Sequence, residues 1–393
     1  MSTPVSVGGV GCSLIDYLYR DVAFDKPAYR RYTSHAPGDG GLITGGLVFA
    51  EDLVRWSNTD LSTIINEITN GASPSSLNLG GPAVVALVHA AQLSSVPVHF
   101  YGHRGDDKTG TQIEEILART PLRWERYTRV PGDTPSTIAL SDPQWNGGMG
   151  ERTFINTLGV AGGFTPEDIH PDFYEHTVTL FGGTGLLPEL HSGLHQPLER
   201  AQEAGAITVV NTVFDFHNES RDPHGPWPVG NSSRSYGATD LLIMDAEEAR
   251  RMSGQQDKIA AAQFFLSKKV GAVIITGGTD PVVVCAGGDR FHPMEPQEFP
   301  VSQLARDELR DGSRPRGDTT GCGDTFVGGV LTGLVEQLAA GERRLDVRDP
   351  LRWGIASGGM TCFHLGGTVI ETERGEKRRE VERYYRAYKE QPQ

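Results

Sequence analysis

Short apolar runs alternate along this chain with longer stretches whose apolar positions repeat at helical spacing. The first run, residues 5–11, ends in a glycine turn, which is a common start for an α/β sheet. Further strand-like runs cover residues 97–101, 137–140, 153–156, 177–181, 206–210, 240–244, 273–276 and 282–285. Parallel strands joined by helices bury both faces of their sheet, so the pattern predicts an α/β fold with a mostly parallel sheet and one main core.

Helical patterns alternate with most of these runs. Residues 83–93 are apolar and rich in small side chains, and they follow a Gly-Gly-Pro turn whose proline suits a first helical turn. Residues 111–117 follow a polar turn in the same way. The apolar positions between 325 and 340 also recur at helical spacing, directly after another glycine turn. The chain therefore begins as β-α-β-α and returns to a helix after residue 324.

Two stretches do not fit this alternation. Residues 21–78 are irregular and rich in Gly, Ser, Thr and Pro, with an amphipathic piece at 53–68, so we expect a peripheral insertion there. Residues 302–317 are polar and lack strand character, which predicts a surface loop.

The composition narrows the class of protein. The chain has 37% hydrophobic and 22% charged residues, as globular proteins do, and its formal charge of −14 argues against nucleic acid or an anionic membrane as a partner. No apolar run approaches the roughly 18 residues of a membrane span, and the N-terminus does not resemble a signal peptide. A cytoplasmic protein is expected. Its four cysteines form no Cys-x-x-Cys pair, which predicts reduced thiols.

The segment Asp318-Thr-Thr-Gly-Cys-Gly-Asp324 leads directly into the helical stretch at 325–340. Backbone N–H groups at a helix start attract negative charge, and glycines let a phosphate approach them, so Gly321, Cys322 and Gly323 are candidates for an anion hole. Phosphoryl transfer also needs a group that takes the proton of the acceptor hydroxyl, which Asp324 could supply. From these residues alone, ordinary helix capping by Asp324 is an equal alternative.

This segment, with Thr325-Phe326 and the Gly-Gly that follows, resembles the C-terminal signature of the ribokinase-like (PfkB) carbohydrate kinases. Cys322 replaces the usual alanine, which keeps a small side chain and the backbone amide. The resemblance implies a three-layer α/β/α sandwich with a mostly parallel central sheet and a small β-rich lid. It also implies a single domain over residues 1–393, with lid and insertion elements within 17–79 and 121–160. The implied activity is ATP-dependent phosphorylation of a sugar hydroxyl, with Asp324 as general base.

Other segments match the family in chain order and imply the acceptor site. Gly80-Gly81 resembles part of the N-terminal signature, and Asp16 matches an early aspartate that binds sugar hydroxyls. Arg152, in a segment like the one after the lid strands, is implied as a substrate contact, although a surface arginine is an equal alternative. Val85 stands where most relatives have an asparagine, so we expect a more apolar acceptor pocket.

The phosphate side is implied in the same way. Asp245 and Glu248 resemble an Asn-x-x-Glu motif that places Mg²⁺, with an acidic first helical turn as the alternative. The nucleotide-binding candidates are Thr276, Gly278, Asp318 and Thr320. Residues 353–367 would cover the adenine, and a monovalent cation such as K⁺ would bind near Asp318.

Several functional alternatives stay open. A nucleoside (adenosine-like) kinase would share this scaffold, and a non-catalytic sugar-binding relative would share the fold. A dinucleotide oxidoreductase is suggested by Gly9 and Gly11, but its third glycine is replaced by Leu14. The expected ligand is a sugar or nucleoside, and a homodimer could form through the strands of the lid.

Overall fold

A computed structural model describes residues 4–36, 38–222, 224–317 and 319–392 of the chain. The larger of its two sheets contains β1 (Val7–Gly11), β5 (Val98–Gly105), β6 (Arg123–Val130), β9 (Val178–Gly182), β10 (Ile207–Asn211), β11 (Leu241–Asp245), β12 (Ala272–Thr276), β13 (Val282–Ala286) and β14 (Met294–Phe299). Their order is β14-β13-β12-β11-β10-β9-β1-β5-β6. All pairs are parallel except those of β13, which is antiparallel to both β12 and β14. The mostly parallel sheet is confirmed.

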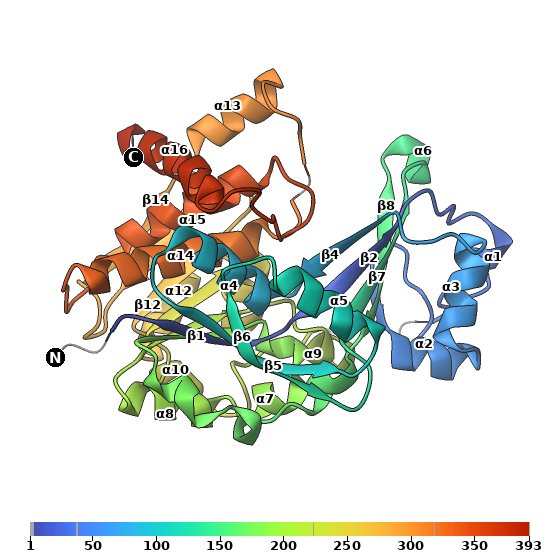
Figure 1. Cartoon of the computed structure of the whole chain (residues 1–393), viewed down its shortest axis with the longest axis horizontal. Helices are drawn as coiled ribbons and strands as arrows, with labels where there is room; N and C mark the ends of the chain where they lie inside the picture. The colour runs from blue at the N-terminus through green and yellow to red at the C-terminus, as the bar shows by residue number, and fades with distance from the viewer. Residues whose placement is uncertain (1–3, 37, 223, 318, 393) are drawn as a thin grey trace.

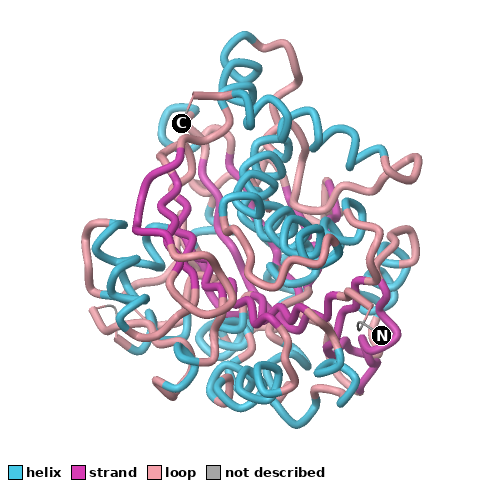
Figure 2. Tube along the Cα trace, turned by 90° about the vertical axis from the view of Figure 1, so that its left-hand side faces the viewer, coloured by secondary structure: helices cyan, strands magenta, loops and turns pink. Residues whose placement is uncertain are grey.

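Helices cover both faces of this sheet, and the strands run between the two helical layers (Figures 1 and 2). One layer contains α4 (Pro82–Leu93), α5 (Lys108–Leu117), α14 (Cys322–Ala339), α15 (Arg348–Thr361) and α16 (Glu376–Glu390). The other contains α7 (Pro188–Ser192), α8 (His195–Glu203), α11 (Ala246–Ser253) and α12 (Lys258–Ser267). Because side chains alternate along a strand, Val7 of β1 packs in the first layer and Val10 in the second. The predicted three-layer sandwich is confirmed.

A second, five-stranded sheet, here called the lid sheet, projects from the end of β1 (Figure 1). It contains β2 (Leu14–Tyr19), β3 (Leu47–Phe49), β4 (Ser76–Gly80), β7 (Ser136–Asp142) and β8 (Glu151–Thr157), in the order β3-β8-β7-β2-β4. Three helices pack against one of its faces: α1 (Pro27–Arg30), α2 (Ala50–Ser57) and α3 (Leu61–Thr69). Leu53 and Ile64 of these helices share a buried core with Leu140 and Ile155 of the sheet. The insertion thus covers one side of the lid sheet.

Shorter helices lie in the connections. They are α6 (Trp145–Gly148), α9 (Phe216–Arg221) and α10 (Arg234–Gly237), with 3-10 turns η1 (Gly159–Gly163), η2 (Pro166–Asp168), η3 (Pro171–Glu175) and η4 (Thr184–Leu186).

The expectation of a loop at 302–317 is wrong, because α13 (Gln303–Asp311) lies within it. The side chain of Ser302 caps the helix by accepting a hydrogen bond from the amide of Ala305, and Gly312 ends it with a φ of 68°. Leu304, Ala305 and Leu309 form an apolar stripe that packs with α15 and α16. A single short stripe among charged residues was too weak a signal in the sequence.

Two further boundaries differ from the expectations. The amphipathic piece at 53–68 is two helices, because Asn58 adopts a left-handed conformation with a φ of 51°. Residues 102–105 extend β5 rather than forming a turn. Within 121–160, β7 and β8 belong to the lid sheet, and β6 pairs with β5 in the large sheet.

Candidate active site

The carboxyl ends of the parallel strands meet at one edge of the large sheet. Gly11 of β1 is in register with Gly182 of β9, which is itself in register with Asn211 of β10. Further along the edge, Asp245 of β11 is in register with Thr276 of β12. Ligands of open α/β sheets bind at such ends, where the chain changes direction between neighbouring strands. This edge therefore frames the candidate site.

The glycine turn at the start of α14 provides the backbone amides of the site. Gly321 is the N-cap of this 18-residue helix and has a φ of 77°, which favours glycine. A Cβ atom at Gly321 would lie 2.1 Å from the Cα atom of Gly367, so the two backbones touch. At Gly323, by contrast, a Cβ atom would meet nothing within 4 Å. The helix start is thus closed by a backbone contact on one side and has open space beside Gly323.

Asp324 lies in the first turn of α14. Part of the residue stays solvent accessible, yet surrounding protein atoms keep most water away from the carboxylate, and this burial raises its pKa to about 6. An ordinary capping aspartate would have a lowered pKa, because helix dipoles and amide hydrogen bonds stabilise the ionised form. At Asp324 the effect of burial acts in the opposite direction.

The charge of Asp324 affects two other titratable groups of the site, Cys12 and Glu248. Burial raises the pKa of the Cys12 thiol, and the negative charges of Asp16 and Asp324 raise it further. On the other side, burial and the charge of Asp245 raise the pKa of Glu248 to about 7, and Asp324 contributes in the same direction. Asp324 is therefore close enough to act on both the lid side and the strand β11 side of the site.

On the lid side, Asp16 lies in β2, the strand that follows β1 in the chain. A Cβ atom at Gly80 would lie 2.2 Å from Oδ2 of Asp16, so only glycine leaves room for this carboxylate over β4. Gly81, with a φ of 101°, then turns the chain into α4. The structure brings Asp16, Gly80 and Gly81 together.

Three residues of this side were missed in the sequence. Strand pairing puts Asn78, Asp16, Thr137 and Asn156 side by side in one row of the lid sheet, here called the polar row. Their side chains share the face opposite the α1–α3 core, because residues of one strand alternate between faces. The Oδ1 atom of Asn156 is buried and accepts no hydrogen bond from the described residues. The alternate positions of β7 and β8 on this face also include the apolar Ala139 and Phe154, so no polar alternation marked this row in the sequence.

Arg152 is not brought to the polar row. It is exposed in β8, on the same face as Asn156 but four residues away, which is about 13 Å along a strand. Val85 is also not where it was expected to act. It is only 1% exposed, and it packs near Gly367, so it does not line an open acceptor pocket.

On the strand β11 side, Asp245 and Glu248 form a capping box at the start of α11. Oδ1 of Asp245 accepts from the amide of Glu248 at 2.8 Å, and Oε2 of Glu248 accepts from the amide of Asp245 at 2.9 Å and from the Thr212 hydroxyl at 2.6 Å. The capping box thus uses one oxygen of each carboxylate. Among the described residues, no group of three or more His, Cys, Asp and Glu side chains is arranged to hold a metal ion by itself.

The remaining nucleotide candidates follow neighbouring elements. Thr276 ends β12 beside Asp245, and Gly278 lies in the turn after it with a φ of 63°. Thr320 lies directly before the helix cap, and Asp318 falls outside the described residues. The structure therefore groups Thr276 and Gly278 on the side of Asp245, and Thr320 on the side of Asp324.

The loop after α15 joins the nucleotide side to the lid sheet. The Thr368 hydroxyl donates a buried hydrogen bond of 2.8 Å to the carbonyl of Leu79 in β4. The amide of Asn78 lies against Gly366, where a Cβ atom would be 1.7 Å from its Nδ2 atom. The C-terminal end of β4 is thus in contact with the loop that also touches Gly321 through Gly367.

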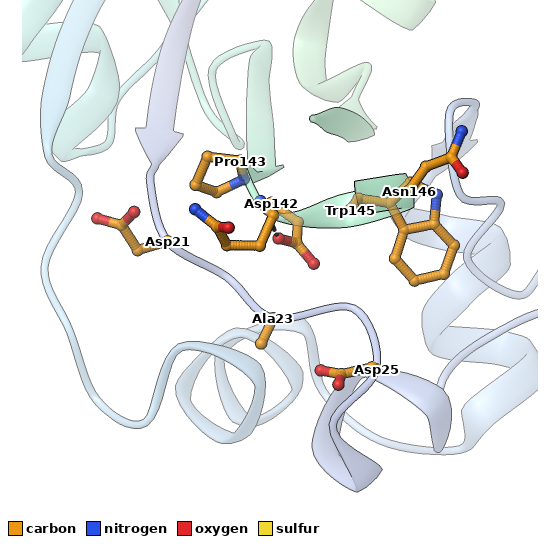
Figure 3. Close-up of a pocket in the computed structure, with 8 residues that line it drawn as sticks. Asp21, Ala23, Asp25, Asp142, Pro143, Trp145 and Asn146 are labelled. Carbon is orange, nitrogen blue, oxygen red and sulfur yellow. Dashed lines mark hydrogen bonds between the residues drawn. The ribbon is translucent and has the colours of Figure 1, made fainter. Parts of the chain in front are cut away.

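A separate hollow of about 350 Å³ lies at the far end of the lid sheet (Figure 3). Its lining includes Asp21, Asp25 and Asp142, together with Trp145. Asp142 accepts hydrogen bonds from the amides of Phe24 at 2.9 Å and Gln144 at 2.9 Å, so its carboxylate fastens the local turns. None of the glycine-turn or capping-box residues lines this hollow.

Comparisons with known proteins agree with this arrangement. A family model described as pfkB family carbohydrate kinase matches residues 66–373. Fructokinase of Solanum tuberosum is 24% identical over 336 residues, which cover 84% of this chain and 93% of that protein. Adenosine kinase of Schizosaccharomyces pombe is 22% identical over 288 residues, which cover 69% of this chain and 75% of that protein. The crystal structure of ribokinase from Thermotoga maritima has the same fold, with a TM-score of 0.61 at 17% identity, covering 97% and 99% of the two chains.

Proposed function

Because the chain belongs to the pfkB family of carbohydrate kinases and is a phosphotransferase with an alcohol acceptor, we propose that it phosphorylates a hydroxyl group of a sugar, with Asp324 as the general base. The family implies ATP as the phosphoryl donor. The glycine turn at residues 321–323 would hold the transferred phosphoryl group, and the polar row of the lid sheet would hold the acceptor.

One observation supports this proposal above the others. The charge of Asp324 acts on Cys12 beside Asp16 and also on Glu248 at the end of β11. A general base for phosphoryl transfer must lie between the acceptor hydroxyl and the phosphate, within reach of the proton that it removes. The position of Asp324 between these two groups supports its assignment as this base, and its pKa of about 6 leaves it mostly ionised at neutral pH.

In the proposed reaction, the acceptor hydroxyl lies between the polar row and the start of α14. A carboxylate oxygen of Asp324 takes the hydroxyl proton while the hydroxyl oxygen bonds to the γ-phosphorus of ATP, and ADP leaves. The amides of Gly321, Cys322 and Gly323 would donate hydrogen bonds to the charge on the equatorial oxygens. Closure of the lid sheet would exclude water, which would otherwise compete as the acceptor.

The residues present fit a triphosphate and its magnesium ion. The space beside Gly323 is open, and the backbone N–H groups at the start of α14 carry the partial positive charge of the helix dipole. The capping box leaves the second oxygen of Asp245 and of Glu248 to hold magnesium through water, and Thr276 and Gly278 lie next to them. When bound, the metal ion would neutralise phosphate charge. A K⁺ ion near Asp318 and Thr320 remains part of this proposal.

The substitution Asp324→Asn tests the role of the base. We expect kcat to fall by about 10² to 10⁴, since the variant keeps the shape of the site but cannot accept a proton. ATP affinity, measured by calorimetry, should change little. Burial penalises the ionised carboxylate, and the variant removes that charge. The free energy of unfolding of the variant at pH 7 should therefore exceed that of the wild type by about 1–3 kcal/mol.

Asp349→Asn is a matched control, because Asp349 lies in the first turn of α15, a helix of the same layer. It loses a similar interaction with a helix dipole and the charge that strengthens the 2.5 Å hydrogen bond from Tyr385, yet it should keep full turnover. Wild-type kcat in Asp324→Asn, or an equal loss in both variants, would rule out the proposed base.

A nucleoside is the second candidate for the acceptor. The next row of the lid sheet, beyond the polar row, contains Leu18, Ala139 and Phe154 in register on the same face. A base attached to a ribose could lie over these apolar side chains while its hydroxyls meet the polar row. The similarity to an adenosine kinase agrees with this candidate.

A thermal-shift series separates the two acceptor classes. With an ATP analogue present, a nucleoside should raise the unfolding temperature more than its free sugar does if the apolar row is used. Phe154→Ala should then remove the difference between the two ligands. If hexoses give the larger shift and Phe154→Ala leaves it unchanged, the nucleoside candidate fails.

A further inference from the structure

Two cysteines far apart in the sequence meet at the glycine turn. Cys322 begins α14 and Cys362 directly follows α15, and their Sγ atoms are 3.6 Å apart without a disulfide bond. Both residues are partly exposed. The other two cysteines, Cys12 and Cys285, are buried. The pair therefore lies within reach of small molecules in solution, at the place where phosphate is proposed to bind.

The surrounding contacts hold the two sulfur atoms near each other. The hydroxyls of Thr325 and Thr361 share a buried hydrogen bond of 2.8 Å, which joins the first turn of α14 to the last turn of α15. The amide of Gly317 donates to the carbonyl of Cys362 at 3.0 Å, and this hydrogen bond attaches the segment before the glycine turn to the end of α15. A disulfide bond is about 2.05 Å long, so the sulfur atoms need to approach by only about 1.5 Å.

The thiols of Cys322 and Cys362 also differ in expected reactivity from those of the buried Cys12 and Cys285. A hydrogen bond from Cys322 and the positive charge of Arg316 lower the pKa of the Cys362 thiol to about 7, although burial opposes this. Burial raises the pKa of both Cys12 and Cys285. Since the thiolate is the form that reacts with oxidants, Cys362 is the thiol expected to react first.

We propose that Cys322 and Cys362 form a reversible disulfide that inactivates the phosphate-binding turn. The proposal rests on the proposed function, because it assumes that the amides of residues 321–323 hold the phosphoryl group. Formation of the bond itself depends only on the geometry of the two thiols. The site is a modification site that couples the oxidation state of the protein to phosphoryl transfer.

A peroxide is a sufficient oxidant. The Cys362 thiolate attacks one oxygen of hydrogen peroxide, the O–O bond breaks, and the hydroxide that leaves takes up a proton to form water. Cys362 is then a sulfenic acid. The Sγ atom of Cys322 loses its proton and attacks the Sγ atom of Cys362, the S–O bond breaks, and the second hydroxide leaves as water. Two thiols and one peroxide thus become one disulfide and two waters, and a dithiol reductant reverses the change.

The bond should disturb the amides because Cys322 is the central residue of the turn. Gly321 and Gly323 on either side have no Cβ atoms to resist rotation, and Gly321 already has a φ of 77°. Drawing the sulfur of Cys322 towards α15 would therefore turn its peptide unit away from the phosphate. Loss of a single aligned donor commonly costs 10² to 10³ in rate, so a fall of roughly tenfold or more in kcat is expected.

The test compares reduced and peroxide-treated full-length protein. Oxidation should lower the number of thiols that react with a chromogenic disulfide reagent from two to zero without denaturant, and mass spectrometry should find a peptide linking residues 322 and 362. The kcat should fall about tenfold and return with dithiothreitol. Cys362→Ala should keep wild-type activity and lose none of it on oxidation.

Cys322→Ala is compared only with its own reduced form and should likewise resist oxidation. Two results would overturn the proposal: no linked peptide after oxidation, or a linked peptide with kcat unchanged. An equal loss of activity in Cys362→Ala would also overturn it, since the damage would then lie elsewhere. Full activity of Asp324→Asn would remove the proposed function, whereas the linked peptide would still report the bond.

Discussion

At the scale of single residues, the main feature of the candidate site is Asp324, a carboxylate whose ionised form is disfavoured by burial. Burial raises the pKa of Asp324 to about 6, and burial with two neighbouring carboxylates raises that of Glu248 to about 7. In the proposed reaction both groups act in their ionised forms, Asp324 as a base and Glu248 towards magnesium. Burial of these two carboxylates therefore destabilises the ionised forms that the proposed reaction needs.

The pH dependence of kcat/KM follows from these two groups. We expect the rate to be constant above neutral pH and to fall tenfold per pH unit below about 6, because protonated Asp324 cannot accept a proton. At low magnesium the fall should begin nearer pH 7, since protonation of Glu248 then competes with the metal. Rates measured from pH 5 to 9 at two magnesium concentrations check this.

Glu248→Gln serves as the control for the magnesium-dependent part. The variant should need more magnesium but should show the fall near pH 6 at both concentrations. A profile that is flat from pH 5 to 9, or one that is unchanged in Asp324→Asn, would contradict the assignment of Asp324.

The sequence located Asp324 and Asp16 but not Asn78, Thr137 or Asn156. Asp324 belongs to a dense local motif, in which a glycine turn and a helix start are visible within a few residues. The members of the polar row come from four separate strands, and their register is set by pairing between segments that are distant in the chain. A single sequence contains no local signal for that register.

At the scale of elements, a buried lysine of α16 connects this helix to α4 and to the loop after α15. Lys377 is 3% exposed, and its Nζ atom donates to Oε1 of Gln92 on α4 at 2.7 Å and to the carbonyl of Val369 at 3.4 Å. Val369 belongs to the loop that contacts Leu79 through Thr368. Burial lowers the pKa of Lys377 to about 7.

Lys377 should make the stability depend on pH. Between about pH 7 and 10.5 the unfolded chain binds a proton at this residue that the folded chain does not, so the free energy of unfolding should rise as the pH rises through this range. In Lys377→Met this rise should be smaller. Urea unfolding at pH 7, 8 and 9.5 measures the difference.

Lys389→Met, at an exposed position of the same helix, is the matched control and should keep the wild-type pH dependence. Equal pH dependence in wild type and Lys377→Met would show that Lys377 is not the group responsible.

At the scale of the whole molecule, the long insertion changes what the lid sheet can do. The helices α1 to α3 cover one face, and the other face contains the polar row. The resemblance implied a possible dimer through the strands of the lid. If two lid sheets paired face to face, such a dimer would have to displace either the helices or the ligand of the polar row. We therefore predict a monomer, and light scattering after size-exclusion chromatography should give a mass near 42.6 kDa.

Twice that mass at micromolar concentration would contradict the prediction. In that case the edge strand β4 would be the next candidate contact, since Leu77 is 38% exposed there. The substitution Leu77→Lys would place a charge on this edge and should restore the monomer. If the Leu77→Lys variant kept the mass of a dimer, the subunits would associate through a surface outside the lid sheet. Independently of assembly, none of the helices within the described ranges combines the length and the apolar character needed to cross a bilayer.

The sequence by itself determined the class of fold, most strands of the large sheet, and the glycine turn with Asp324, because each depends on the order of residues within one short segment. The tertiary structure decided what that turn meets. It brought Asp16 over Gly80, the polar row into register, Gly367 against Gly321, and Cys362 beside Cys322. These contacts join segments that lie tens of residues to more than a hundred residues apart, and only the packing of the two sheets and of α14 on α15 brings those segments together.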